Sequence, residues 1–434
     1  MSDSPLENYL ERELGEARQD SSGAFTLSPT EALRKLAGFQ LPDKQSWACK
    51  VVQAAVAAGA TGISLRLLER EAVFSLSGPI AWEIEAVEQA LLSPEPGPLR
   101  CLWHLKQGLW SVGLHEGRPF WLQGAGWPQS LLWDGQALSR QDCPLAQKTV
   151  LWVSHARHDQ PKGLAYYLGS GFSSHNADLL KEMLARCFVC PVPLDVDALR
   201  IDALQNCPGQ GNSAQSYLLQ VGFSQSGSWF LGVPAHTSRP PGKQDSAQDP
   251  FKSGYQPPAN LPELASLIIL LAAHLGRGRG KDSYQVSLNP CSLYWVLDGV
   301  VVERQALPFT ERACSFGLIA SAEGLSLDVS GFRLRQTPEL EERINGLLLE
   351  AWPFVRAGSA DFSHFVADQK EQQLNITVAL GAFGAGIIWF FPPFGAMVLG
   401  LSAASHLLRS DQAGQLVSGL QDDLRLLQLE WEKS

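Results

Sequence analysis

The chain has 434 residues, with 34 Lys and Arg against 44 Asp and Glu and a formal net charge of −10 at pH 7. A hydrophobic fraction of 45% with only 18% charged residues excludes a disordered chain, and the length predicts more than one folded domain. The acidic balance, without any basic block, argues against nucleic-acid binding, which needs clustered Lys and Arg to neutralise phosphates.

The first segment, residues 1–26, predicts a short polar helix followed by a Ser/Gly linker. It is acidic and amphipathic and lacks the apolar stretch of a signal peptide, so we expect the main body in the reducing cytoplasm. Eight cysteines are scattered along the chain. Cys187 and Cys190 form the single CxxC, which we interpret as buried, reduced thiols because a zinc ribbon would need a second pair.

The next block, residues 27–160, predicts a sandwich of helices and strands. Helices are expected at residues 28–38 and 43–58, where glycines end both of them. Helices followed by a run of short strands favour the α+β class. Strands are expected at residues 62–68, 72–77, 110–115, 118–123, 130–133 and 149–155.

A second α+β domain is expected over residues 170–350, with a helix at 176–186. Residues 236–260 are rich in Pro, Gly, Ser and Gln and predict a long mobile loop. Further helices are expected at 261–275, which is apolar, and at 338–352. Strands are expected at residues 192–201, 214–223, 228–233, 283–289, 294–302 and 316–320.

The last part, residues 351–434, predicts an α-helical region that contains an uncharged stretch at 374–408. Pro392 and Pro393 divide this stretch into two arms, which we interpret as a transmembrane or re-entrant hairpin. A helical hairpin buried in a dimer core is the alternative. Residues 411–432 predict a heptad helix for self-association. Small residues spaced for close helix packing in lipid include Gly381, Ala385 and Gly400.

The stretch KVVQAAVAAGAT at residues 50–61, followed by GISLRLL and AVFSLSGPI, resembles the ATP-binding unit of the GHKL superfamily. This superfamily includes DNA gyrase, MutL, histidine kinases and heat-shock chaperones. The resemblance implies a GHKL-like (Bergerat-type) α/β sandwich followed by the smaller α+β transducer domain. It also implies a lysine in that smaller domain that senses the γ-phosphate, for which Lys281 is the candidate.

The residues that perform the family's chemistry are replaced in this chain. The glutamate that activates water falls on Lys50, whose ammonium we expect to stay charged and unable to accept a proton at neutral pH. The asparagine that holds magnesium falls on Ala54, which has no ligand atom. The aspartate of the same helix falls on Ala57, and the aspartate that reads adenine falls near Leu76. Gly78 remains, in a turn.

The nearest candidate for the family's phosphate-cradling loop is HLKQGLWSVGL, with Gly108 and Gly113. No metal site is expected: His155 and His158 lack a third ligand at a suitable spacing and are interpreted as exposed loop residues.

We therefore expect a non-catalytic, GHKL-like binding or scaffold protein that needs no cofactor. A membrane hairpin at residues 374–408 would anchor it, with the soluble body in the cytoplasm, a homodimer and an unidentified protein as partners, and no nucleic acid. Two alternatives stay open: a divergent, chaperone-like ATPase that binds ATP with Mg, and a membrane-disrupting effector with a soluble sensor body.

Overall fold

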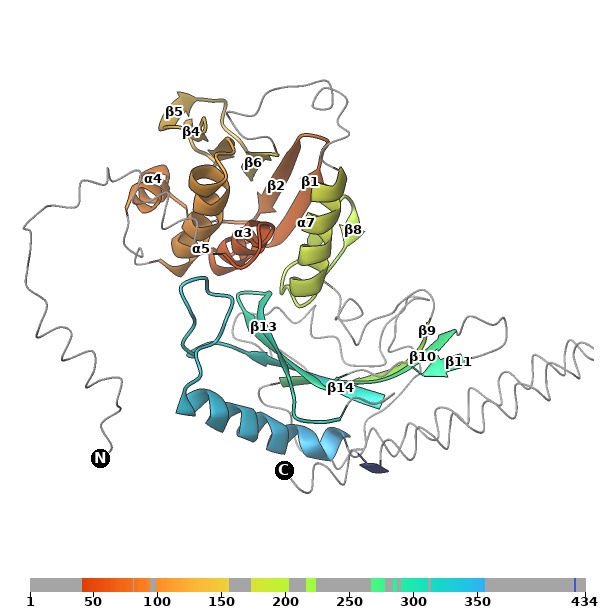
Figure 1. Cartoon of the computed structure of the whole chain (residues 1–434). Coiled ribbons are helices and arrows are strands. Elements are labelled where there is room, and N and C mark those ends of the chain that lie inside the picture. The colour runs from red at the N-terminus through yellow and green to blue at the C-terminus, as the bar shows by residue number, and fades with distance from the viewer. Residues whose placement is uncertain are drawn as a thin grey trace, which may run out of the picture.

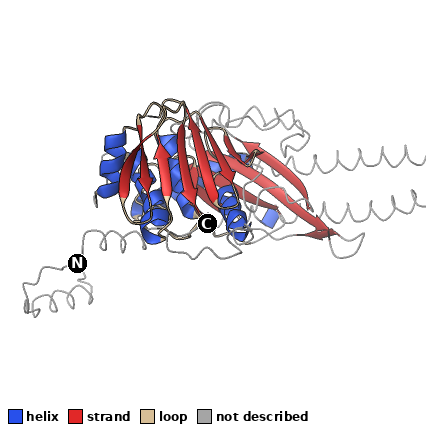
Figure 2. Ribbon diagram, turned by 90° about the horizontal axis from the view of Figure 1, so that it is seen from above, coloured by secondary structure: helices blue, strands red, loops and turns tan. Residues whose placement is uncertain are grey.

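The structure is a computed structural model. It describes residues 41–80, 82–93, 99–155, 173–202, 216–223, 267–277, 284–286, 290–310, 314–355 and 425–426. Within these residues the protein is an α+β fold with two sheets and helices packed between them (Figure 1). Seen from above, the strands fan out across the molecule with the helices beside them (Figure 2).

The first sheet has eight strands in the order β5-β4-β3-β6-β2-β1-β7-β8. Neighbouring strands run antiparallel, except that β1 and β7 run parallel. Burial alternates along β2 and β6, as expected for strands with one face on a core. The strands are β1 (Gly62–Leu67), β2 (Glu71–Ser77), β3 (Phe120–Gln123), β4 (Gln129–Trp133), β5 (Leu138–Asp142), β6 (Thr149–Ser154), β7 (Leu194–Val196) and β8 (Leu199–Arg200).

One helix, α3 (Ser46–Ala57), is central to the arrangement because it packs against both α5 and α7 (Figure 1). On the sheet side, Trp47 meets Phe74 edge-to-face with 5.8 Å between ring centroids. Residues 46–55 of α3 are all buried. The other helices are α4 (Ile84–Leu92), α5 (Arg100–Leu109), its π-helical continuation η1 (Trp110–His115) and α7 (Ser173–Arg186).

The second sheet has six strands, in the path β11-β10-β14-β12-β13 with β9 also paired to β10. Alternate residues of β10 enter different cores: Leu267 and Ile269 join the main core, while Ile268 and Leu270 join a cluster with Phe188. A helix at residues 338–355 lies along this sheet (Figure 1). The strands are β9 (Ser216–Phe223), β10 (Leu267–Arg277), β11 (Tyr284–Val286), β12 (Ser292–Leu297), β13 (Val300–Ala306) and β14 (Cys314–Ser321).

Most of the elements predicted within the described residues are confirmed. They include α3, β1, β2, β3, β4, β6, α7, β9, β14 and the helix that begins at residue 338. The strand predicted at 294–302 is two strands, because Asp298 and Gly299 form a turn between β12 and β13 with φ of 47° and 76°. The strands predicted at 192–201, as part of the second domain, instead join the first sheet as β7 and β8.

Two predicted elements have the wrong type. Residues 110–115, predicted as a strand, continue α5 as η1. Residues 261–275, predicted as a helix, overlap the strand β10 (Leu267–Arg277). A uniformly apolar run fits a buried helix and a strand covered on both faces equally well, and strand pairing with β9 and β14 decides the outcome.

Several predicted segments lie outside the described residues. They are the N-terminal helices at 1–38, the loop at 236–260, the hairpin at 374–408, Lys281, and residues 411–432 except for a helical pair at 425–426. The helices that the structure does describe are all too short or too polar to span a bilayer.

Candidate functional site

The predicted site residues of α3 lie on one face of the helix, since positions three, four and seven residues apart are neighbours. Lys50 and Ala54 are fully buried on this face, and Ala57 is partly buried. Gln53, between them, donates from Nε2 to the carbonyl oxygen of Leu297 at 3.0 Å. This face of α3 therefore meets the end of β12.

We call this contact region the seam: it joins α3, α5 and α7 to β12, β13 and the loop at residues 321–335. Lys50 lies within it, with Nζ 4.3 Å from the ring centroid of Phe332. Among the described residues Nζ has no hydrogen-bond partner. Burial lowers the pKa of Lys50 from 10.5 to about 7, although the charges of Asp328 and Asp298 act in the opposite direction. Burial removes the water that would stabilise the charge, so the ammonium is held less firmly at neutral pH than the sequence-based expectation assumed.

A second cation lies over the same aromatic ring. The guanidinium carbon of Arg186, from the end of α7, is 4.8 Å from the ring centroid of Phe332. Phe332 is 5% exposed. Cations over an aromatic face are attracted by its electron density. Two basic side chains from different helices thus contact the same aromatic ring of the protein.

The β12–β13 turn is attached to α5. Asp298 accepts hydrogen bonds from Arg100 at 2.7 Å and contacts Nε2 of His104 at 3.0 Å. Arg100 also contacts Glu323 at 2.7 Å. Burial lowers the pKa of His104, and it outweighs the opposing effect of Asp298. The turn is therefore fixed by charge-assisted contacts at one end of the seam.

The loop at 321–335 approaches the helices closely. Nε2 of Gln107 donates to the carbonyl oxygen of Val329 at 2.8 Å. Gly331 has a φ of +65°, and a Cβ there would lie 2.6 Å from Nζ of Lys50. A larger residue would need both a strained backbone and a displaced amine. The loop and the helices are therefore packed without space for a further group at this point.

Two further predicted site residues, Leu76 near the end of β2 and Gly78 just after it, have structural explanations. Leu76 is 1% exposed and belongs to the main core. Gly78 has a φ of +107°, and a Cβ there would lie 2.8 Å from the backbone nitrogen of Thr61. Only glycine fits such a position without strain. Neither residue needs a nucleotide beside it to account for its identity.

The expectation of a phosphate-cradling loop at Gly108 and Gly113 is wrong, because both residues are helical. A Cβ on Gly108 would lie 3.0 Å from the carbonyl oxygen of Trp47, so this glycine lets α5 approach α3. A Cβ on Gly113 would lie 2.7 Å from the ring of Phe120. Close packing, and not a ligand, explains these glycines.

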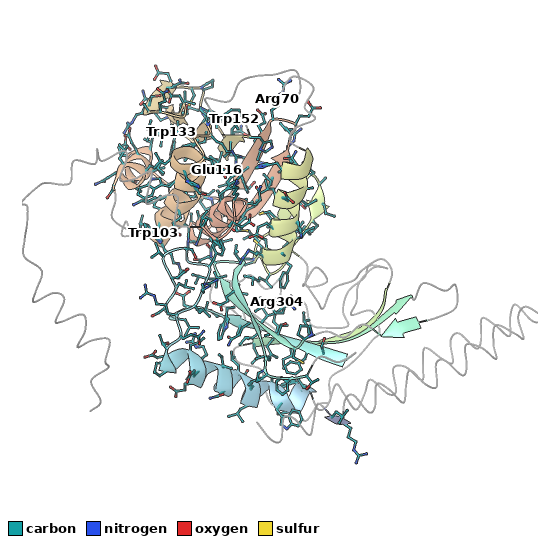
Figure 3. The ribbon with its side chains drawn as sticks, in the orientation of Figure 1. Arg70, Trp103, Glu116, Trp133, Trp152 and Arg304 are labelled. Carbon is teal, nitrogen blue, oxygen red and sulfur yellow. The ribbon has the colours of Figure 1, made fainter. Side chains whose placement is uncertain are left out.

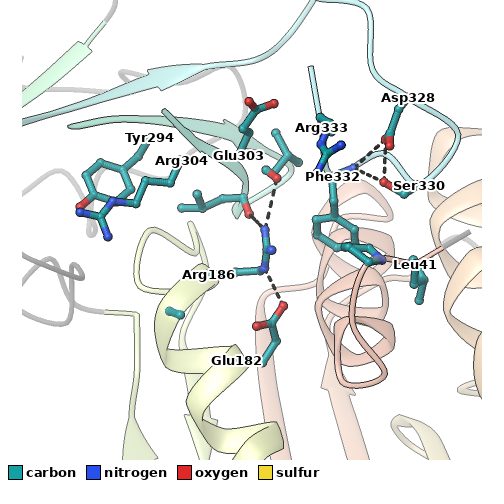
Figure 4. Close-up of a pocket in the computed structure, with 14 residues that line it drawn as sticks. Leu41, Glu182, Arg186, Tyr294, Glu303, Arg304, Asp328, Ser330, Phe332 and Arg333 are labelled. Atoms are coloured by element: carbon teal, nitrogen blue, oxygen red, sulfur yellow. Dashed lines mark hydrogen bonds and ion pairs between the residues drawn. The ribbon is translucent and has the colours of Figure 1, made fainter. Parts of the chain in front are cut away.

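A pocket of about 670 Å³ lies beside the seam, between α7, β13 and the loop at 321–335 (Figure 4). Arg304 of β13, labelled in Figure 3, is one of the residues that line this pocket. The guanidinium of Arg186 donates to the carbonyl oxygens of Val301 and Val302 at 2.9 and 3.2 Å. The charged lining residues are Glu182, Arg186, Glu303, Arg304, Asp328 and Arg333.

His155 and the two CxxC cysteines singled out in the sequence are buried in the structure. His155 is 6% exposed, so the expectation of an exposed residue is wrong; its ring lies 4.6 Å from that of His175. Burial lowers the pKa of His155 to about 3 and that of His175 to about 4. No group of three or more potential ligands within the described part of the chain could hold a metal. Cys187 and Cys190 are free and buried, as predicted.

Sequence reasoning missed the residues that build the seam, namely Arg186, His104, Asp298 and Phe332. One local signal was available, since an Asp-Gly pair between apolar strands indicates a tight hairpin at 298–299. Nothing in the sequence indicates that this turn meets α5, or that Phe332 reaches α3.

Comparison with known proteins gives limited similarity. No protein-family model and no curated protein matches the chain. The fold is similar to the N-terminal domain of a DNA repair protein, with a TM-score of 0.37 and 10% identity over 73% of this chain and 95% of that chain. It is also similar to a mutant MutL ATPase domain from Aquifex aeolicus, with a TM-score of 0.28 and 9% identity over 71% of this chain and 98% of that chain. Similarity at these values says nothing about which residues act or what the chain binds.

Proposed function

We propose that the chain is a non-catalytic, GHKL-like binding or scaffold protein whose second sheet and loop occupy the place of a nucleotide. One observation carries the proposal: Phe332 lies against Lys50, the position where the sequence resemblance places the catalytic glutamate. A neutral amine at Lys50 would have the proton affinity of a base, but its side chain is 0% exposed. A general base must come within hydrogen-bond reach of its substrate, and this one is covered.

The other requirements of ATP hydrolysis are unmet for the same reason. Ala54 offers no oxygen for magnesium, and Leu76 is an apolar core residue where a carboxylate would read adenine. Gln53, the polar neighbour of these positions, already binds the carbonyl oxygen of Leu297. The hydrogen bonds of the seam instead connect α3, α5 and α7 to the second sheet, and such a network makes the two parts rigid relative to each other.

The test is a titration of the full chain with magnesium ATP, followed by thermal unfolding and phosphate release. A ligand present at 100 times its Kd stabilises the native state by about 2.7 kcal/mol, so binding must raise the Tm. We expect no rise at millimolar ATP and no phosphate release. Hydrolysis by the purified chain that is lost in Lys50→Met would contradict the proposal and support the divergent ATPase.

The proposal includes membrane anchoring by residues 374–408, which rests on the uncharged sequence of that stretch. Fractionation of the full chain beside a version ending at Asp368 tests it. The full chain should sediment with membranes, and the truncated chain should stay in the supernatant. Equal solubility of the two would reject the anchor, and depolarisation of cells by the full chain alone would favour the membrane-disrupting alternative.

A further inference from the structure

We propose that the pocket between α7, β13 and the loop at 321–335 binds a small organic dianion through Arg304 and Arg333. The pocket has a volume of about 670 Å³, within the range of roughly 300–1,000 Å³ that is typical of small-molecule sites. It is lined by three arginines and three carboxylates, so a ligand can pair only with charges that have no charged partner in the protein.

Each of the three carboxylates has partners within the protein. Glu182 contacts Nε of Arg186 at 2.6 Å and accepts from the hydroxyl of Ser46 at 2.9 Å. Asp328 accepts from the hydroxyl of Ser330 at 2.6 Å. Glu303 accepts from the backbone N–H of Leu334. Glu182 is therefore paired with a cation, whereas Asp328 and Glu303 are fixed in orientation by neutral donors.

Among the residues that the structure describes, two of the three guanidinium groups have no carboxylate partner. The guanidinium of Arg304 donates to the neutral hydroxyl of Ser292 at 3.2 and 3.1 Å and lies 5.5 Å from the ring centroid of Tyr294. The side chain of Arg333 is exposed and has no hydrogen bond or ion pair within the described residues. Guanidinium groups bind carboxylates and phosphates through paired N–H donors. Two such groups remain available to a ligand.

The positions of these arginines define the shape of the ligand. Figure 4 shows Arg304 on one side of Arg186 and Arg333 on the other. Arg186 between them is fixed by Glu182 and by the edge of β13. A matching ligand therefore has two separated anionic groups joined by a spacer, which would pass the partly apolar wall that includes Phe332. Because the lining comes from both sides of the seam, such a ligand would also link α7 to the second sheet.

The test is isothermal titration calorimetry of the full chain with succinate, glutarate, adipate, inorganic phosphate and pyrophosphate. Dicarboxylates of increasing length and the two phosphate probes distinguish a carboxylate ligand from a phosphate ligand. We expect at least one of the two-anion probes to bind, and Arg304→Gln and Arg333→Gln each to weaken it by about tenfold. Arg335→Gln is the matched control, because Arg335 is an exposed arginine of the same loop that does not line the pocket.

Two results would overturn the proposal: no heat of binding from any probe at millimolar concentration, or an equal loss of affinity in Arg335→Gln and the pocket variants. Unchanged thermal unfolding of the three variants shows that a loss of binding is not a loss of folding. The same variants separate this proposal from the proposed function. If ATP raises the Tm of the wild type but not of Arg304→Gln, ATP binds in this pocket. If the rise persists in Arg304→Gln, ATP binds elsewhere, which contradicts the proposed loss of the nucleotide site.

Discussion

Replacement of Lys50 by methionine tests the physical basis of the seam. Methionine keeps the length of the lysine stem and fills the same space, but it has no amine to bury. Because Nζ has no hydrogen-bond partner among the described residues, the substitution leaves no donor or acceptor unsatisfied there. We expect Lys50→Met to be more stable than the wild type at neutral pH.

The magnitude follows from the pKa of Lys50. Its decrease from 10.5 to about 7 corresponds to roughly 5 kcal/mol, at about 1.4 kcal/mol for each pKa unit. Since the folded pKa is below the unfolded one, the unfolded state binds more protons between these two pH values. Stability therefore rises with pH across this window, and the full cost is present below pH 7. The lost contact with Phe332 offsets about 1 kcal/mol of the gain in the variant.

The assay is urea unfolding of wild type and Lys50→Met at a series of pH values, roughly pH 6 to pH 9. The difference in unfolding free energy between the two proteins cancels the titration of all other groups. It should shrink by about 2 to 3 kcal/mol from pH 7 to pH 9. Lys181→Met, at an exposed position of α7, is the control and should show no such dependence.

A pH-independent difference, or a Lys50→Met protein less stable than the wild type at pH 7, would refute this reasoning. Either result would mean that the amine has a partner that compensates its burial.

Three further predictions concern the same region and the first sheet. Gly78→Ala should destabilise the protein by about 2 kcal/mol or more, because the added Cβ would meet the backbone nitrogen of Thr61 just before β1. Gly126→Ala is also at positive φ but has no atom within 4 Å, so it should cost only about 1 kcal/mol. Thermal unfolding of both variants measures the difference. Asp298→Asn removes the charge that binds two side chains of α5, so we expect a loss of about 1 to 2 kcal/mol and faster hydrogen exchange in α5; unchanged exchange would argue against the attachment. The pKa of His175 is lowered to about 4 by burial, so wild-type stability should fall as pH decreases from about 6.5 toward 4; His175→Gln should reduce this loss in acid unfolding, and an identical loss would contradict the cause.

Local features of the sequence predicted much of the first sheet and its central helix. The glycine at residue 59, with a φ of +84°, ends α3 as predicted from the sequence. Alternating apolar residues identified β1 and β2. The same reasoning failed for residues 110–115, which were predicted as a strand and instead continue α5 as η1. Gly113 lies against Phe120 there, and this contact is made only in the folded protein.

The candidate site was predictable only in part, and the residues explain why. The replacement of a carboxylate by an amine at Lys50 can be read directly from the chain. Its altered pKa cannot, because that depends on burial beneath Phe332, a residue far away in sequence. Arg186 and Asp298 were missed for the same reason, since neither lies in a local motif that indicates its partner.

The sequence by itself determined the residue chemistry: an amine, a methyl group and an isobutyl side chain stand where the resemblance requires acids and an amide. It also determined those helices and strands whose pattern depends on near neighbours. The tertiary structure alone decided that β7 and β8 complete the first sheet, that β10 is a strand, and that the second sheet closes over α3. Contacts such as Gln53 to Leu297 join residues 244 positions apart, and their geometry depends on the packing of the entire chain between them.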